Sequence, residues 1–145
     1  MSQHHVVLLL GSNIGDRKKN ILTAVENIEK NIGTILMQSE LIETKPVEFC
    51  SSNIFFNFAV SIKTTFSPIQ LLNAVKKIEI DMGRKEDSSI IGHFTDRIID
   101  IDIVEYNNLL YKCKKLEVPH LKHLNERDFS KKLIKEIKHK YTYKL

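Results

Sequence analysis

One stretch of the sequence reads Arg97-Ile-Ile-Asp-Ile-Asp-Ile-Val104, and its alternation predicts a β-strand with two different faces. Isoleucines at alternate positions are expected to enter the core from one face: Ile99, Ile101 and Ile103. Asp100 and Asp102 then project together from the other face. Two carboxylates this close repel each other unless a cation or a proton lies between them. Because Asp is depleted in strands, two in succession favour a functional pair over a solvated surface pair.

The segments before this strand alternate between strand and helix patterns. Strands are expected at Val6–Leu10, Thr34–Glu43 and Ile54–Thr64, and helices from Asp16 to Gly33 and from Ser67 to Gly83. The order β-α-β-β-α-β predicts an α+β fold with a ferredoxin-like core, in which helices pack on a mostly antiparallel sheet. After the strand we expect a turn at Asn107-Asn108, a β-hairpin with its second strand at Leu109–Cys113, and a C-terminal helix that begins at Asn125 or Ser130.

Length and composition indicate one globular domain spanning residues 1–145. The net charge of +4 suits an anionic partner, either a nucleotide or a nucleic acid. Cys50 and Cys113 lie in no C-x-x-C motif, so no disulfide framework or zinc site is implied. No signal peptide or membrane-spanning stretch is evident. We therefore expect a cytoplasmic, monomeric protein that does not bind membranes.

The acidic pair predicts a magnesium site. Mg²⁺ prefers oxygen ligands and is commonly held by one or two carboxylates together with substrate phosphates. Arg97 precedes the pair, and Arg84 stands at the mouth of a long polar segment that has no periodicity. Arginine suits phosphate recognition because its guanidinium is planar and always charged. These residues, with Asp100 and Asp102, predict an enzyme that transfers phosphate groups.

Five short motifs, taken together, resemble the family of 6-hydroxymethyl-7,8-dihydropterin pyrophosphokinase. They follow the family's order along residues 6 to 129: Gly11-Ser-Asn-Ile-Gly-Asp16, Glu79 with Gly83-Arg84, Arg97-x-x-Asp100-x-Asp102, Val118-Pro-His120 and Arg127-x-Phe129. The third motif is the most specific. Members of this family transfer a diphosphate from ATP to a pterin alcohol in tetrahydrofolate biosynthesis.

The resemblance implies a role for each matching residue. Asp100 and Asp102 match the ligands of two Mg²⁺ ions, and Arg84 and Arg97 match arginines that position the transferring phosphates. The positions that match ATP contacts are Lys76, Glu79, Ile103, Lys115, His120 and Arg127. The positions that match pterin contacts are Thr44, Val47, Phe55, Asn57 and Phe129. The two phenylalanines would stack on the flat ring, and the amide of Asn57 would recognise its edge.

The chain departs from the family pattern at several points. Thr95 and Asp96 replace a small residue and a proline, and Glu86 stands where a second basic residue is expected. One extra residue lies between His120 and Arg127, and the tail Lys131–Leu145 is basic rather than apolar. Two alternatives follow: a catalytically impaired relative that serves as an interaction module, and a small basic nucleic-acid-binding domain. The acidic pair argues against the second.

Overall fold

The computed structural model describes residues 2–44, 54–83 and 97–144. Its elements, in chain order, are β1 (His4–Ser12), α1 (Arg17–Asn31), β2 (Gly33–Gln38), β3 (Ile42–Thr44), β4 (Phe55–Thr64), α2 (Pro68–Asp81), β5 (Asp100–Tyr106), β6 (Tyr111–Lys112), β7 (Glu117–Val118), the π-helical turn η1 (Lys122–Glu126) and α4 (Asp128–Lys144). None of the helices in these ranges combines the length and apolar character needed to cross a bilayer.

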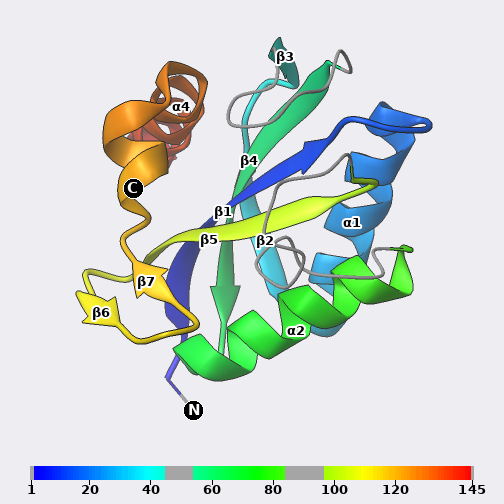
Figure 1. The fold of residues 1–145 in the computed structure, drawn as a ribbon. Helices are drawn as coiled ribbons and strands as arrows, with labels where there is room; N and C mark the ends of the chain where they lie inside the picture. Colours follow the sequence, from blue (N-terminus) through cyan, green and yellow to red (C-terminus); the bar gives the residue numbers. More distant parts are fainter. Residues whose placement is uncertain (1, 45–53, 84–96, 145) are drawn as a thin grey trace.

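The main sheet has the strand order β2-β4-β1-β5, and the short β3 pairs with the beginning of β4. All of these pairings are antiparallel. Helices α1 and α2 cover one face of the sheet, and α4 lies against the other face (Figure 1). The predicted α+β fold with a ferredoxin-like core is confirmed, because α1 joins β1 to β2 with β4 between them, and α2 joins β4 to β5 with β1 between them.

Local capping explains where the first two helices begin. The Asp16 side chain accepts a hydrogen bond from the backbone N–H of Lys19, as an N-cap does. Ser67 and Gln70 form a complete capping box, in which each side chain accepts a hydrogen bond from the backbone N–H of the other residue. Both N-termini were expected from these residues, and both expectations are confirmed.

The sheet separates two apolar layers. The larger layer fills the space under α1 and α2, and it contains the three predicted core isoleucines, Ile101 and Ile103 of β5 and Ile99 just before it. The smaller layer lies under α4, where Leu133, Ile134 and Ile137 pack on Val7 and Leu9 of β1. The basic tail is therefore an amphipathic helix whose apolar stripe completes the fold.

Two segments differ from the sequence-based expectation. The strand predicted at Thr34–Glu43 is divided into β2 and β3, because the hydroxyl of Ser39 accepts the hydrogen bond of the Ala59 N–H in place of a backbone carbonyl. The turn at Asn107 exists, with φ of 50°, but the segment after it does not return along β5. The hairpin instead consists of β6 and β7, which form a separate two-stranded sheet.

Candidate active site

The predicted acidic pair lies on the face of the sheet that α4 covers only in part. Asp100 and Asp102 share this face of β5, and their side chains are 23% and 28% exposed. In the register of the sheet, Gly11 of β1 is opposite Asp100 on one side and opposite Asn57 of β4 on the other. Because neighbouring strands lie about 4.8 Å apart, the carboxylate of Asp100 and the amide of Asn57 flank a strip of backbone with no side chain of its own.

Asp100 is held next to Arg97. A guanidinium nitrogen of Arg97 lies 3.0 Å from Oδ1 of Asp100, and the Arg97 side chain is 9% exposed. The backbone of Arg97 is fixed by Asn13, whose side-chain oxygen accepts the Arg97 N–H at 2.7 Å. The N–H of Asn13 donates in turn to the carbonyl of Arg97 at 3.2 Å. The motif after β1 thus holds the arginine of the β5 motif in place.

Asp102 contacts a histidine that the sequence did not single out. Nε2 of His123 lies 2.7 Å from Oδ2 of Asp102, and Nδ1 of His123 lies 2.7 Å from the hydroxyl of Ser130. Burial by itself would raise the pKa of the Asp102 carboxyl. The hydrogen bond and charge of His123, with the charges of His120 and Arg127, outweigh burial and lower this pKa to about 2. The carboxylate is therefore ionised at neutral pH.

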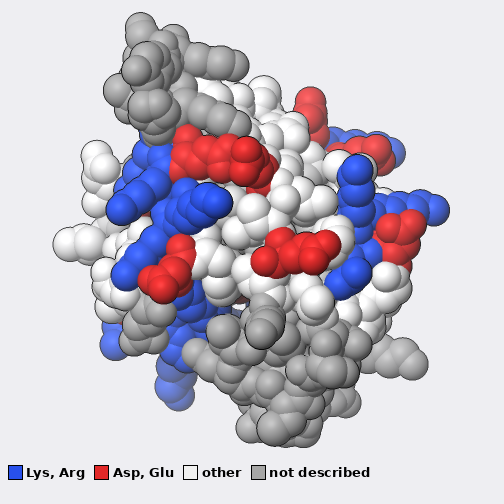
Figure 2. Space-filling model, turned by 90° about the horizontal axis from the view of Figure 1, so that it is seen from above, with Lys and Arg blue, Asp and Glu red and all other residues white. Residues whose placement is uncertain are grey.

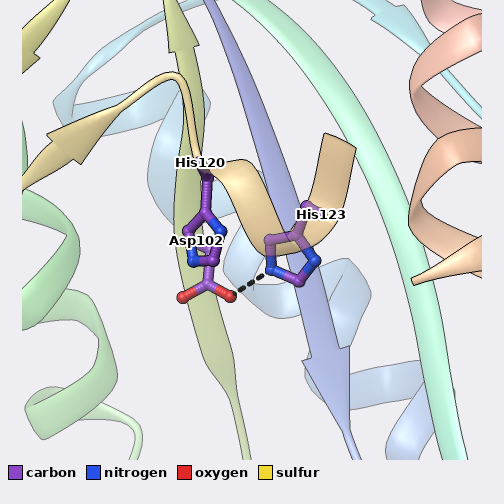
Figure 3. A group of neighbouring side chains, drawn as sticks. All are labelled: Asp102, His120 and His123. Atoms are coloured by element: carbon purple, nitrogen blue, oxygen red, sulfur yellow. Dashed lines mark hydrogen bonds and ion pairs between the residues drawn. The ribbon is translucent and has the colours of Figure 1, made fainter. Parts of the chain in front are cut away.

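His120 approaches the same carboxylate from the chain segment before η1. Its backbone N–H donates to the carbonyl of Val104 at 2.8 Å, where β5 departs from regular pairing with β1. The rings of His120 and His123 lie 4.2 Å apart between centroids, and both point toward Asp102 (Figure 3). Burial lowers the pKa of His120, and the charge of Asp102 opposes this effect.

The extra residue between His120 and Arg127 is accommodated in η1. The N–H of Arg127 donates to the carbonyl of Lys122 at 3.0 Å, five residues earlier, which is the hydrogen bond of a π-helix. This wide turn contains His123 and brings it under the Asp102 carboxylate. The π-helical turn therefore lies in the segment where an extra residue was expected, and it contributes the His123 side chain to the site.

Four of the five residues expected to contact a pterin lie within the described ranges. The amide nitrogen of Asn57 donates a hydrogen bond to the hydroxyl of Thr44. Phe55 lies beside Gly11, because a Cβ built on Gly11 would be 3.5 Å from a ring carbon of Phe55 and 3.2 Å from the amide oxygen of Asn57. Phe129 packs at the start of α4, and its ring plane makes an angle of 72° with that of His123 at a centroid distance of 6.4 Å. Val47 lies outside the described residues.

The residues expected to contact ATP are more dispersed. Arg127 is near Asp102 and His120, where its charge affects both groups. The carboxylate of Glu79 is buried and accepts the N–H of Ile101 at 2.8 Å, so it supports β5. Ile103 is buried in the layer under α1 and α2, so an ATP contact here would have to come from its backbone.

Two other residues expected to contact ATP have exposed surface. Lys76 is 42% exposed and lies 3.8 Å from Glu79, and Lys115 is exposed between β6 and β7. Arg84 and the departures at Glu86, Thr95 and Asp96 lie outside the described residues. The roles of all these positions stay predictions.

The donor atoms on β5 fit a magnesium site. Asp100 and Asp102 present carboxylate oxygens on one face, and each carboxylate has one oxygen close to a basic side chain, Arg97 or His123. Concentrated negative charge of this kind, partly accessible to solvent, matches the oxygen ligands that Mg²⁺ prefers.

Comparisons with known proteins identify the family of this chain. The sequence profile of the family described as 7,8-dihydro-6-hydroxymethylpterin-pyrophosphokinase (HPPK) matches residues 7–139. The chain belongs to the HPPK family. The family expected from the five motifs is thereby confirmed.

The HPPK relatives include proteins of similar length and much longer ones. The chain is 40% identical over 124 residues to the 2-amino-4-hydroxy-6-hydroxymethyldihydropteridine pyrophosphokinase of Aquifex aeolicus, and the match covers 86% of this chain and 74% of that protein. It is also 40% identical over 124 residues to the folic acid synthesis protein FOL1 of Dictyostelium discoideum, where the match covers 86% of this chain but only 18% of the relative. The chain thus spans about a fifth of the longer relatives.

A solved structure supports the HPPK fold. A Plasmodium falciparum HPPK-DHPS variant, solved with pterin and p-hydroxybenzoate, superimposes with a TM-score of 0.65 at 18% identity. The match covers 91% of this chain and 39% of that chain. At this identity the likeness concerns the fold alone.

Proposed function

We propose that this chain transfers a diphosphate from ATP to 6-hydroxymethyl-7,8-dihydropterin, giving AMP and the pterin diphosphate, as a step of tetrahydrofolate biosynthesis. Membership of the HPPK family supports the reaction class. The structural observation that carries the proposal is the position of Gly11 between Asp100 and Asn57. It sets a pair of metal-binding carboxylates beside an amide and an aromatic ring suited to a flat heterocycle.

On this proposal the acceptor ring lies against Phe55 and Phe129 and is recognised along its edge by Asn57 and Thr44. The hydrogen bond from Asn57 to Thr44 fixes the orientation of the amide, so that its oxygen faces Gly11. Aromatic faces and a fixed amide suit a planar ring that both donates and accepts hydrogen bonds. Val47 is proposed as an apolar neighbour of the ring.

The triphosphate would lie over β5, where Asp100 and Asp102 would hold two Mg²⁺ ions. When bound, the ions neutralise negative charge on the phosphates and align them with the acceptor. Arg97 stays beside Asp100 through its contact with Asn13, and Arg84 is proposed to contact the phosphates from the segment after α2. Lys76, Glu79, Ile103, Lys115, His120 and Arg127 are proposed to surround the rest of ATP.

In the reaction, the hydroxyl oxygen of the pterin attacks the β-phosphorus of ATP, and the bond from this phosphorus to the oxygen shared with the α-phosphate breaks. AMP leaves with that oxygen, and the hydroxyl proton passes to solvent. Most of the rate in phosphoryl transfer comes from positioning and electrostatic stabilisation. The fixed side chains of Arg97 and Asn57 provide the positioning on the two sides of Gly11.

The expectation of a nucleic-acid-binding domain is less well supported than the transfer reaction. On the face in Figure 2, acidic groups lie between the groups of Lys and Arg, so the described residues form no continuous basic surface there. We propose that the partners are the two small substrates and that the chain works as a monomer in the cytoplasm. Light scattering on the purified protein tests the oligomeric state.

The decisive experiment measures AMP after incubation with ATP, Mg²⁺ and the pterin alcohol. Asp100→Ala is expected to reduce the rate by about 100- to 1,000-fold, the usual effect of removing one electrostatic contact to a transition state. Asp81→Ala is the matched control, since Asp81 is an exposed residue of α2 that pairs with Lys77, and it should change the rate by less than twofold. Background levels of AMP from a folded parent protein would overturn the proposal and favour the impaired relative.

A further inference from the structure

A second set of metal-binding groups overlaps the acidic pair. Asp102, His120 and His123 each offer one ligand atom, and these atoms all lie within 4.8 Å of one another. The three side chains come from β5, from the segment after β7 and from η1, and they converge on one point (Figure 3). Nε2 of His123 and Oδ2 of Asp102 already lie 2.7 Å apart.

The chemistry of these ligands differs from that of a magnesium site. Two imidazole nitrogens and one carboxylate oxygen form the ligand set of many zinc sites, whereas Mg²⁺ prefers oxygen alone. Zinc sites with three protein ligands leave a fourth position for water or another small ligand. We propose that Asp102, His120 and His123 form a binding site for a divalent transition metal of the Zn²⁺ class.

The surroundings of His123 are those of a metal ligand. A ligating histidine usually donates its second ring N–H to a neighbouring acceptor, which fixes the tautomer and the ring orientation. Here Ser130, which is fully buried, places its hydroxyl 2.7 Å from Nδ1 of His123. In the metal-free chain Nε2–H donates to the Asp102 carboxylate. When a metal takes the place of this proton, Nδ1 carries the remaining proton and donates it to the Ser130 hydroxyl, so that the lone pair of Nε2 is directed at the metal.

Only a small adjustment closes the site. Ligand atoms around a tetrahedral Zn²⁺ are about 3.3 Å apart, since each bond is about 2.0–2.1 Å long. His123 is buried and its ring is fixed, whereas His120 is half-buried on a segment without regular structure. Rotation of the His120 side chain is therefore the movement that brings the third ligand to the metal, while its backbone stays bonded to Val104.

The site shares Asp102 with the proposed magnesium site. A transition metal held here engages this carboxylate together with two imidazoles, so it competes with Mg²⁺ for Asp102. Zn²⁺ is therefore expected to inhibit the proposed transfer reaction. Binding of the metal itself needs neither ATP nor pterin, so it can be measured whether or not the transfer reaction occurs.

The test is a titration of the metal-free chain with Co²⁺, followed by displacement with Zn²⁺. Co²⁺ bound to two imidazoles and a carboxylate absorbs visible light, and Zn²⁺ should abolish this absorption at one equivalent. Thiols also bind these metals, so the titration is carried out in a background in which both cysteines, Cys50 and Cys113, are replaced by serine.

Four variants locate the site. His123→Ala and His120→Ala should each weaken Zn²⁺ binding by more than tenfold, and Ser130→Ala by about 10- to 100-fold. His4→Ala is the matched control, because His4 contacts Tyr106 and Asn107 at the other end of β1, and it should leave the affinity within twofold. Circular dichroism checks that His123→Ala is folded. If His123→Ala unfolds, the test of the site relies on His120→Ala instead. The proposal fails if the parent binds no Zn²⁺, or if His120→Ala binds it as tightly as the parent.

Discussion

The side chain of Asn13 accepts a hydrogen bond from the backbone N–H of Arg97 at 2.7 Å, and the N–H of Asn13 donates to the Arg97 carbonyl at 3.2 Å. Two segments that are 84 residues apart are joined by this reciprocal contact. Both residues are buried. The contact fixes the backbone of Arg97, three residues before the first aspartate of the acidic pair on β5.

Asn13→Ala should therefore destabilise the fold by about 1–3 kcal/mol, because the N–H of Arg97 would be left buried without this acceptor. Urea unfolding measures the change. Asn73→Ala, on the exposed side of α2, is the control and should stay within about 0.5 kcal/mol of the parent. Equal stabilities for the two variants would contradict the role given to Asn13.

Asn57→Ala should raise the KM for the pterin by about tenfold, which corresponds to the loss of one hydrogen bond of about 1.4 kcal/mol. The KM for ATP should change by less than twofold, because Asn57 lies across Gly11 from the acidic pair. Steady-state kinetics with each substrate varied in turn gives both values. Thr44→Val should shift the pterin KM in the same direction, since its hydroxyl holds the amide. Equal increases in both KM values would argue against a pterin contact.

The Asp102 carboxylate should contribute to stability in a defined pH range. Its pKa is about 2 in the folded protein and 3.8 for an unperturbed carboxyl, so the folded state favours the ionised form. The contribution is present above about pH 4 and is lost as the pH falls toward 2. Unfolding free energies of the parent and Asp102→Asn, measured from pH 5 to pH 2.5 in metal-free buffer, should therefore converge at low pH. A constant difference would contradict the pKa shift.

Gly33→Ala should destabilise the chain by about 2 kcal/mol or more, because a Cβ at this position would clash with the backbone carbonyl oxygen of Lys63. Neither backbone can move without opening the pairing of β2 with β4. Chemical denaturation measures the loss. Thr34→Ala changes the exposed neighbour in the same strand and should cost much less. A Gly33→Ala variant as stable as Thr34→Ala would show that the strands can separate easily.

The parts of the fold that could be predicted are those with local causes. The caps at Asp16 and Ser67 depend on residues within one helical turn, and the alternation along β5 separates its two faces without reference to other strands. The partner of the hairpin strand could not be predicted in this way. A turn at Asn107 indicates a reversal of the chain but does not specify which strand follows it, and β6 pairs with β7.

In the candidate site, too, features with local causes could be predicted and features that depend on the fold could not. The acidic pair could be predicted from its residue types and spacing, whereas Asn57 was expected only from the resemblance to the family. His123 was not predicted, since its importance depends on the π-helical turn that directs it to Asp102. The extra residue before Arg127 was the available signal. A count of residues cannot show that the added length forms a wide turn rather than a bulge or a longer loop.

The bare backbone at Gly11 has a consequence for inhibitors. Any other residue at this position would place its Cβ 3.2 Å from the amide oxygen of Asn57 and 3.5 Å from the ring of Phe55. On the proposed function, a compound that lies flat over Gly11 contacts a position at which a resistance mutation also obstructs the pterin. Resistance to such a compound would have to arise at its other contacts, so Gly11 is the part of this surface against which a durable inhibitor is best designed.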